Sequence, residues 1–77
     1  MNKSVWDETK RMLKPGDYVE VSYLRMGLPQ KRKMEISKVL EKGISFLSNP
    51  SEGKKFYVNF QVIEEVKKVE RTGLEVY

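Results

Sequence analysis

The stretch FYVNFQV, residues 56–62, decides the fold class because it alternates strictly between apolar and polar side chains. Side chains of a β-strand point to opposite faces in turn, so every second residue from Phe56 to Val62 faces a core. The intervening Tyr57, Asn59 and Gln61 face the other way. We therefore predict a β-strand here, with one buried face and one open face.

The same period of two predicts a first strand over residues 17–23, where alternate valine and tyrosine side chains face the core. Residues 26–30 read as a loop, because they include a glycine and a proline that disfavour a continuous strand. A second strand then begins near Arg32. Its alternation breaks at residues 37–38, which predicts a bulge or a sharp bend of the kind that small barrels need at a corner.

The remaining turns and strands are short. Residues 41–43 read as a tight hairpin turn whose glycine takes positive φ, and residues 44–48 form a third strand. A turn cluster at 49–53 leads into the strand quoted above. After that strand, a single helical turn around 61–64 and a short strand over 65–70 explain the loss of alternation.

An amphipathic helix is predicted over about residues 4–13. Ser4 and Asp7 form a variant of the capping box at its start, and apolar side chains then recur at helical spacing. Residues 14–16 end the helix with a proline and a glycine. We expect Trp6 to anchor the helix on the sheet, whereas an exposed Trp6 would be a hot spot for a partner.

These elements predict a mainly β protein, in which an N-terminal α-helix precedes five or six antiparallel strands of a small SH3-like or Sm-like barrel. An oligonucleotide-binding fold is disfavoured, because residues 48–55 cannot hold the helix that it needs between its third and fourth strands. The 77 residues predict a single domain, 1–77, with the barrel over about 17–70. In the tail, residues 71–77, the weak alternation of residues 74–77 predicts an edge strand, within the protein or added to a neighbouring subunit.

The chain has no cysteine and no histidine, which removes disulfides, thiolate chemistry and the usual zinc ligands. No pair of carboxylates suggests a cleft for acid–base catalysis, and no glycine-rich loop suits a triphosphate. We therefore predict a binding protein that is not an enzyme and uses no cofactor and no metal. Without such supports, so small a core is expected to gain stability from self-association as a homo-oligomer.

Neither a membrane anchor nor a signal peptide is predicted. Charged residues interrupt the first 14 residues, and no other segment approaches the roughly 18 apolar residues of a membrane span. The expectation is a soluble, cytoplasmic protein that does not bind membranes.

The net charge of +4 comes from the first half of the chain. Residues 1–42 hold ten basic and six acidic side chains, whereas residues 43–77 hold five of each. The excess is densest from Arg25 to Lys38, where Glu35 alone opposes five cations. These cations and one tyrosine are the candidate nucleic-acid contacts: Arg25, Lys31, Arg32, Lys33, Lys38 and Tyr57.

The basic run 31–33 suits phosphate contacts, since each cation that neutralises a phosphate releases a counterion. Its alternative is a solvated hairpin tip, and residues 54–55 could extend the same patch. Tyr57, beside the amides of Asn59 and Gln61, could stack on a base and read its edge, as single-strand binders do. Its alternative is a half-exposed sheet face.

The order of helix, Pro-Gly turn and bent antiparallel strands over residues 4–70 resembles the Sm-like family, which includes the Sm, Lsm and Hfq RNA-binding proteins. At the family's first motif, Glu41 stands at the acidic position and Ile44 at the hydrophobic one. Ser45 replaces the asparagine that helps to hold a base, and Glu35 replaces a glycine.

At the family's second motif, Ile63 fits, but Asn59 and Phe60 stand where an arginine and a glycine are typical. The resemblance therefore implies the fold, and ring assembly through exposed edge strands, more than the family's RNA pocket. Residues 14–21 also look like the start of other SH3-like barrels, including ribosome-associated ones.

The predicted function is nucleic-acid binding by a small barrel, with RNA favoured over DNA and phosphate contacts on the first hairpin. The alternative is a protein-interaction or self-assembly module, which recruits a protein partner or a second copy through Trp6, residues 74–77 and an edge strand. A small regulator encoded by a virus or a mobile element fits either hypothesis.

Overall fold

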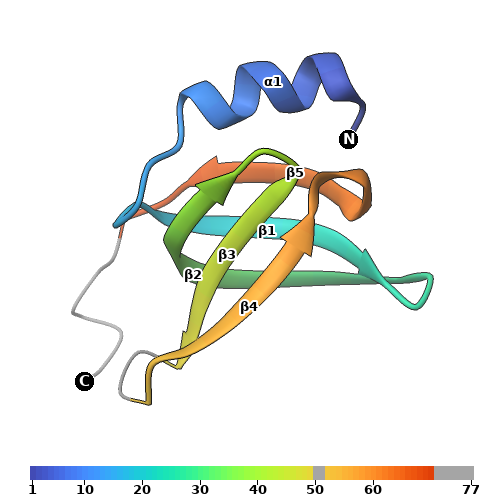
Figure 1. Ribbon diagram of the computed structural model, residues 1–77. Coiled ribbons are helices and arrows are strands. Elements are labelled where there is room, and N and C mark those ends of the chain that lie inside the picture. Colours follow the sequence, from blue (N-terminus) through green and yellow to red (C-terminus); the bar gives the residue numbers. More distant parts are fainter. Residues whose placement is uncertain (50–51, 71–77) are drawn as a thin grey trace.

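One helix and five antiparallel strands make up the computed structural model, which describes residues 1–49 and 52–70 (Figure 1). A single turn of 3-10 helix precedes the last strand. The elements in chain order are α1 (Lys3–Arg11), β1 (Tyr18–Arg25), β2 (Leu28–Leu40), β3 (Gly43–Asn49), β4 (Lys54–Asn59), η1 (Phe60–Val62) and β5 (Ile63–Lys68). The prediction of a mainly β chain with an N-terminal helix is confirmed.

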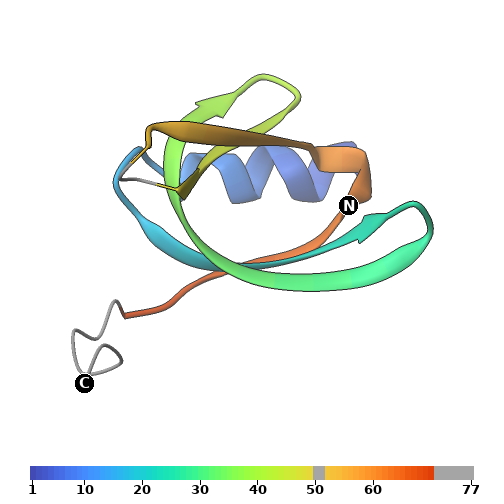
Figure 2. The ribbon, with the colours of Figure 1, turned by 90° about the horizontal axis from the view of Figure 1, so that it is seen from below.

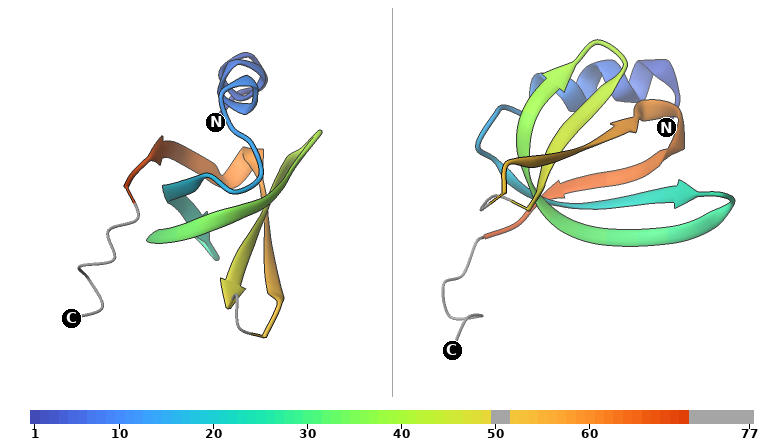
Figure 3. Two further views of the ribbon diagram at one scale, coloured as in Figure 1. Left: turned by 90° about the vertical axis from the view of Figure 1, so that its left-hand side faces the viewer. Right: turned by 60° about the horizontal axis from the view of Figure 1, so that its bottom comes forward.

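The strands form one sheet in the order β4-β3-β2-β1-β5, so the chain runs through three successive hairpins before β5 returns to β1. Figure 2 shows β2 as one long curved strand, and Figure 3 shows the β3–β4 half of the sheet at a steep angle to the β1–β5 half. Within the described residues no ladder joins β4 to β5. The sheet is therefore strongly bent but open, and the closed form of the predicted barrel is not found.

The core lies on the concave side of the sheet, and α1 covers one end of it (Figure 3). The Trp6 side chain is fully buried and stacks on Phe60, with ring centroids 5.7 Å apart. Its indole N–H donates to the carbonyl oxygen of Glu41 over 2.9 Å. Trp6 is thus the anchor that the sequence predicted, and it is not an exposed hot spot.

The start of α1 differs from the prediction. Asn2, rather than Ser4, is the N-cap, and its side-chain oxygen accepts a hydrogen bond from the backbone N–H of Val5 over 2.9 Å. The predicted capping box of Ser4 and Asp7 is therefore wrong by two residues. Asp7 instead lies 3.5 Å from Lys3 and 3.3 Å from Lys10 in ion pairs along the helix.

The predicted loop over residues 26–30 is wrong, because β2 already begins at Leu28. Met26 and Gly27 alone make the turn, with φ of 54° and 79°, the left-handed values that two-residue hairpin turns favour. Pro29 pairs with Leu24 of β1, and β2 has no neighbour on its other side before Glu35. Proline is tolerated at this edge position because no strand lies on that side to accept a hydrogen bond, so its lack of an N–H costs nothing.

The predicted bend in β2 is confirmed as a register shift between Ile36 and Lys38 in the pairing with β3. The predicted role of Gly43 is wrong, since positive φ occurs among the described glycines only at residues 16, 27 and 53. Gly43 is needed for space: a Cβ there would clash with the carbonyl oxygen of Val58 on the neighbouring strand.

The strand predicted over residues 56–62 is shorter in the structure. β4 ends at Asn59, whose side-chain oxygen accepts from the N–H of Gln61 over 2.8 Å and caps η1. Val62 is consequently exposed instead of buried, and β5 begins with the buried Ile63. The predicted edge strand over 71–77 lies outside the described residues.

Candidate nucleic-acid interface

The β1–β2 hairpin extends beyond the rest of the sheet (Figure 1). Pairing of β1 with β5 stops at Tyr23, and pairing of β2 with β3 starts at Glu35. Residues 24–29 therefore pair only with one another, as a two-stranded ribbon. We call residues 24–33, which hold this ribbon and the basic run behind it, the arm.

The register of the hairpin assigns each cation of the arm to a face, because residues directly opposite in an antiparallel pair share one face. Val21 of the core lies opposite Arg32, so Arg32 belongs to the concave face. Arg25 lies two residues beyond the buried Tyr23 and has the same orientation. Lys31 and Lys33, opposite Ser22 and Glu20, belong to the convex face.

The concave face of the arm joins a small aromatic cluster. The Arg32 guanidinium lies 5.7 Å from the ring centroid of Phe56, a geometry that allows a cation–π contact. Phe56 in turn packs against Tyr23, with centroids 5.8 Å apart and ring planes at 57°. Tyr23 and Phe56 also line an open hollow of about 210 Å³ between the arm and β4, and Arg25 and Tyr57 border the same hollow.

Lys38 and Tyr57 lie elsewhere on the convex face. Lys38 is opposite Ser45, which is opposite Tyr57, so the two candidates flank Ser45 across three strands, roughly 10 Å apart by the usual strand spacing. The Tyr57 side chain is 49% exposed. Lys38 comes after the register shift in β2, and Glu35 lies between it and the basic run 31–33 in the chain. Tyr57 nevertheless borders the hollow that Arg25 lines, so the structure brings Tyr57 close to the end of the arm and leaves Lys38 apart from it.

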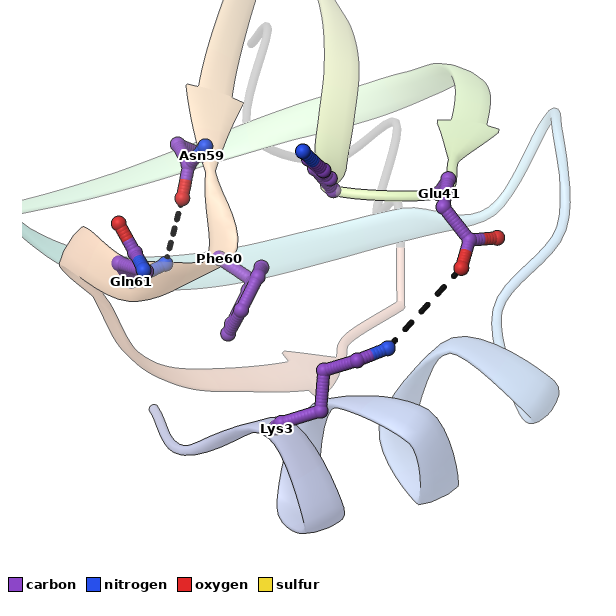
Figure 4. Close-up of a pocket in the computed structure, with 6 residues that line it drawn as sticks. Lys3, Glu41, Asn59, Phe60 and Gln61 are labelled. Carbon is purple, nitrogen blue, oxygen red and sulfur yellow. Dashed lines mark hydrogen bonds and ion pairs between the residues drawn. The ribbon is translucent and has the colours of Figure 1, made fainter.

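The predicted base-reading row of Tyr57, Asn59 and Gln61 is wrong. Gln61 lies in η1 and not on the strand. Asn59 uses its side-chain oxygen to cap η1, as Figure 4 shows. Only Tyr57 of the three projects from the face of a strand into solvent.

Figure 4 shows a second hollow, of about 280 Å³, between α1, the β2–β3 turn and η1. Glu41 lies here, 4.0 Å from Lys3 and 3.6 Å from Lys10. The carboxylate that the Sm resemblance places at a base-holding position therefore pairs with lysines of the helix. The Lys10 hydrogen bond, helped by the charge of Lys3, also holds the pKa of Asp7 below its ordinary value. The ion pairs at this hollow therefore hold the helix against the β2–β3 turn.

The sequence reasoning missed three apolar side chains of the arm, namely Leu24, Met26 and Leu28, all of which are exposed. Met26 and Leu28 fall in the predicted loop over residues 26–30, and Leu24 follows the predicted strand over residues 17–23. The available signal was the alternation on both sides of the Met-Gly pair, which is typical of a two-residue hairpin turn.

Among residues 1–49 and 52–70 no group of three or more acidic side chains could hold a metal ion, and no helix there is long and apolar enough to cross a membrane. Comparisons of the chain with protein-family models, with curated proteins and with solved structures each found no match. The Sm-like or SH3-like resemblance stays a prediction from the chain's own pattern.

Proposed function

We propose that this protein is a non-catalytic nucleic-acid-binding domain whose arm contacts phosphates. The observation that carries the proposal is the charge of the hairpin: from Val21 to Met34 the chain holds four cations and no acidic residue. Those cations, Arg25, Lys31, Arg32 and Lys33, are all exposed. A projecting hairpin end that lacks acidic residues from Val21 to Met34 suits a polyanion better than a protein surface of mixed charge.

The finer description of the fold is part of the same proposal. Three hairpins in succession, a 3-10 turn and a last strand returned to the first support an open SH3-like barrel. The predicted preference for RNA goes with the resemblance to the Sm-like RNA-binding family and with stacking on Tyr57, and of the row beside Tyr57, Gln61 lies in η1 and the side-chain oxygen of Asn59 caps it. The proposal is therefore made for nucleic acid as a class, in a cytoplasmic setting.

The test is a fluorescence anisotropy titration of labelled single strands and duplexes at rising salt. The logarithm of the binding constant should fall linearly with the logarithm of the salt concentration, because each phosphate contact releases counterions. In the double variant Lys31→Gln/Arg32→Gln the slope should flatten by about 1.8 for duplexes and about 1.4 for single strands, from about 0.9 and about 0.7 per contact. The variant Lys14→Gln/Lys42→Gln loses the same charge away from the arm and should keep the slope. Absence of binding at low salt would refute the proposal.

Self-association is the second candidate, favoured by the two open edges of the sheet. Within residues 1–49 and 52–70, β4 and β5 each pair on one side only. The β4 edge is basic at Lys54 and Lys55, and the β5 edge carries two glutamates and two lysines, so the unpaired backbone groups of the edges favour association more than opposite charge does. Light scattering over a range of protein concentrations tests this candidate, and a constant monomer mass would exclude it.

A further inference from the structure

The tip of the arm holds a methionine that folding alone does not explain. Met26 is 95% exposed and has a φ of 54°. Left-handed backbone costs a residue with a Cβ about 1–2 kcal/mol, and glycine, asparagine or aspartate usually occupies this turn position. Met26 thus combines a strained backbone with an apolar side chain left in water, and neither feature stabilises the domain.

The neighbours of Met26 extend the apolar tip. Leu28 across the turn and Leu24 on β1 are both exposed, and Arg25 lies between Leu24 and Met26 in the chain. Apolar groups at the end of a basic ribbon suit a partner that offers an anionic entrance and an apolar interior. Nucleic-acid grooves and anionic membranes both have that character.

The distribution of the cations decides between these two partners. Arg25 and Arg32 belong to the concave face of the hairpin, and Lys31 and Lys33 belong to the convex face. A membrane or a flat surface would engage one face and leave the cations of the other in water. A groove bordered by phosphates on both sides engages both faces at once.

The dimensions of the ribbon favour one kind of groove. The major groove of B-form DNA is about 12 Å wide and admits a two-stranded β-ribbon. The corresponding groove of double-stranded RNA is deep and narrow, and side chains cannot read it. At the floor of the DNA major groove, the thymine methyl group is the apolar target.

We infer that the arm enters the major groove of double-stranded DNA, with Met26 and Leu28 against thymine methyl groups and the cations of the two faces on the phosphates of the two walls. The inference rests on the proposed function and deepens it. It also explains why a methionine occupies the strained turn, since Met26 at this turn is 95% exposed at the tip of the arm.

The experiment compares an A·T-rich DNA duplex with the same duplex in which uracil replaces thymine, which removes only the methyl groups in the major groove. The wild-type chain should bind the uracil duplex several-fold more weakly. The variant Met26→Asn suits positive φ, so its melting temperature should be retained or raised, yet the difference between its affinities for the two duplexes should be smaller than in the wild type, with Leu28 accounting for what is left. Met12→Asn, at a methionine that is 64% exposed beside the helix, should keep the difference.

A second measurement tests the two walls. Arg25→Gln/Arg32→Gln and Lys31→Gln/Lys33→Gln should each flatten the salt dependence of duplex binding by about 1.8. An effect of only one pair, equal binding of single strands, equal binding of both duplexes by the wild type, or a preference for phosphatidylserine vesicles would overturn the inference. Binding of nucleic acid with any of the first three results would leave the proposed function standing, whereas no binding at all would remove both.

Discussion

The helix-covered end of the sheet and the arm use large apolar side chains in opposite ways. At the covered end Trp6 is fully buried, stacks on Phe60 and hydrogen-bonds to a backbone carbonyl. At the arm, Met26 is almost fully exposed on strained backbone. The first arrangement stabilises the fold and the second does not. The comparison shows that a chain of 77 residues keeps part of its apolar surface outside the core.

The largest test of this comparison is Trp6→Ala. Loss of the stacked, buried ring should cost about 3–5 kcal/mol, against a total stability of about 4–12 kcal/mol for a domain of this size. We expect the variant to be mostly unfolded in thermal denaturation followed by circular dichroism. Trp6→Phe keeps an aromatic ring for the stack and loses the hydrogen bond and part of the buried ring, so it should be destabilised less and remain folded. A stable Trp6→Ala protein would show that the helix is dispensable.

The next test compares glycines at the two ends. Gly43→Ala would place a Cβ against the backbone oxygen of Val58 and should cost about 1–3 kcal/mol, because two strands must separate. Gly27→Ala in the arm meets no atom within 4 Å, so its cost should come only from positive φ, about 1–2 kcal/mol. Urea denaturation measures both. A neutral Gly43→Ala would contradict the close approach of β3 and β4.

A smaller change of the opposite sign is expected at the arm. Met26→Asn relieves the strained turn and removes no buried contact, so it should raise the free energy of unfolding by up to about 1 kcal/mol. Met12→Asn, the control outside the arm, should leave stability nearly unchanged. A clear loss of stability in Met26→Asn would mean that the exposed tip contributes to the fold after all, and the contrast between the two ends would fail.

The smallest effect is a pH dependence at the covered end. Lys10 and Lys3 lower the pKa of Asp7, and the backbone N–H of Lys14, together with Lys68, lowers the pKa of Asp17. A lowered pKa stabilises the fold above the unfolded value of about 3.9, and this contribution is lost as pH falls through the folded pKa. The melting temperature should therefore decline in acid below about pH 4.

Two substitutions isolate that acid effect. Asp7→Asn and Asp17→Asn should each make the melting temperature less dependent on pH in this range, because each removes one carboxylate that is ionised more readily when folded. An unchanged acid profile in both variants would assign the dependence to other carboxylates. Arm variants such as Lys31→Gln should leave it as it is.

Local patterns predicted most of the fold. Alternation placed β1, β3 and the start of β4 and identified the bend in β2. It failed at residues 26–30, where composition suggested a loop, because proline on an unpaired edge is compatible with a strand. It also failed at Val62, since a cap made by Asn59 turns the chain before the alternation ends. Both errors have one cause. Whether a backbone N–H needs a partner depends on the neighbouring strands, and local alternation does not reveal those neighbours.

The sequence predicted which charged residues belong to the candidate site, but not how they are arranged on the surface. The basic run 31–33 was evident, but only the register of β1 with β2 shows that Arg32 and Lys31 occupy opposite faces. Tyr57 was placed correctly on the open face, whereas the hollow that it shares with Arg25 is formed only when the sheet bends. The tip at Met26 was missed because exposure is a property of the folded chain.

The return of β5 to β1 also sets an order of events during synthesis. The three hairpins from β1 to β4 join neighbouring segments, so each can pair soon after it leaves the ribosome. β1, however, keeps one edge unpaired until Ile63–Lys68 follows, and α1 lacks the ring that stacks on Trp6 until Phe60 follows, although Glu41 is made earlier. The first segments to be made are thus the last to be completed. A nascent chain exposes the edge of β1 for most of its synthesis, which makes that strand the one most in need of protection from aggregation.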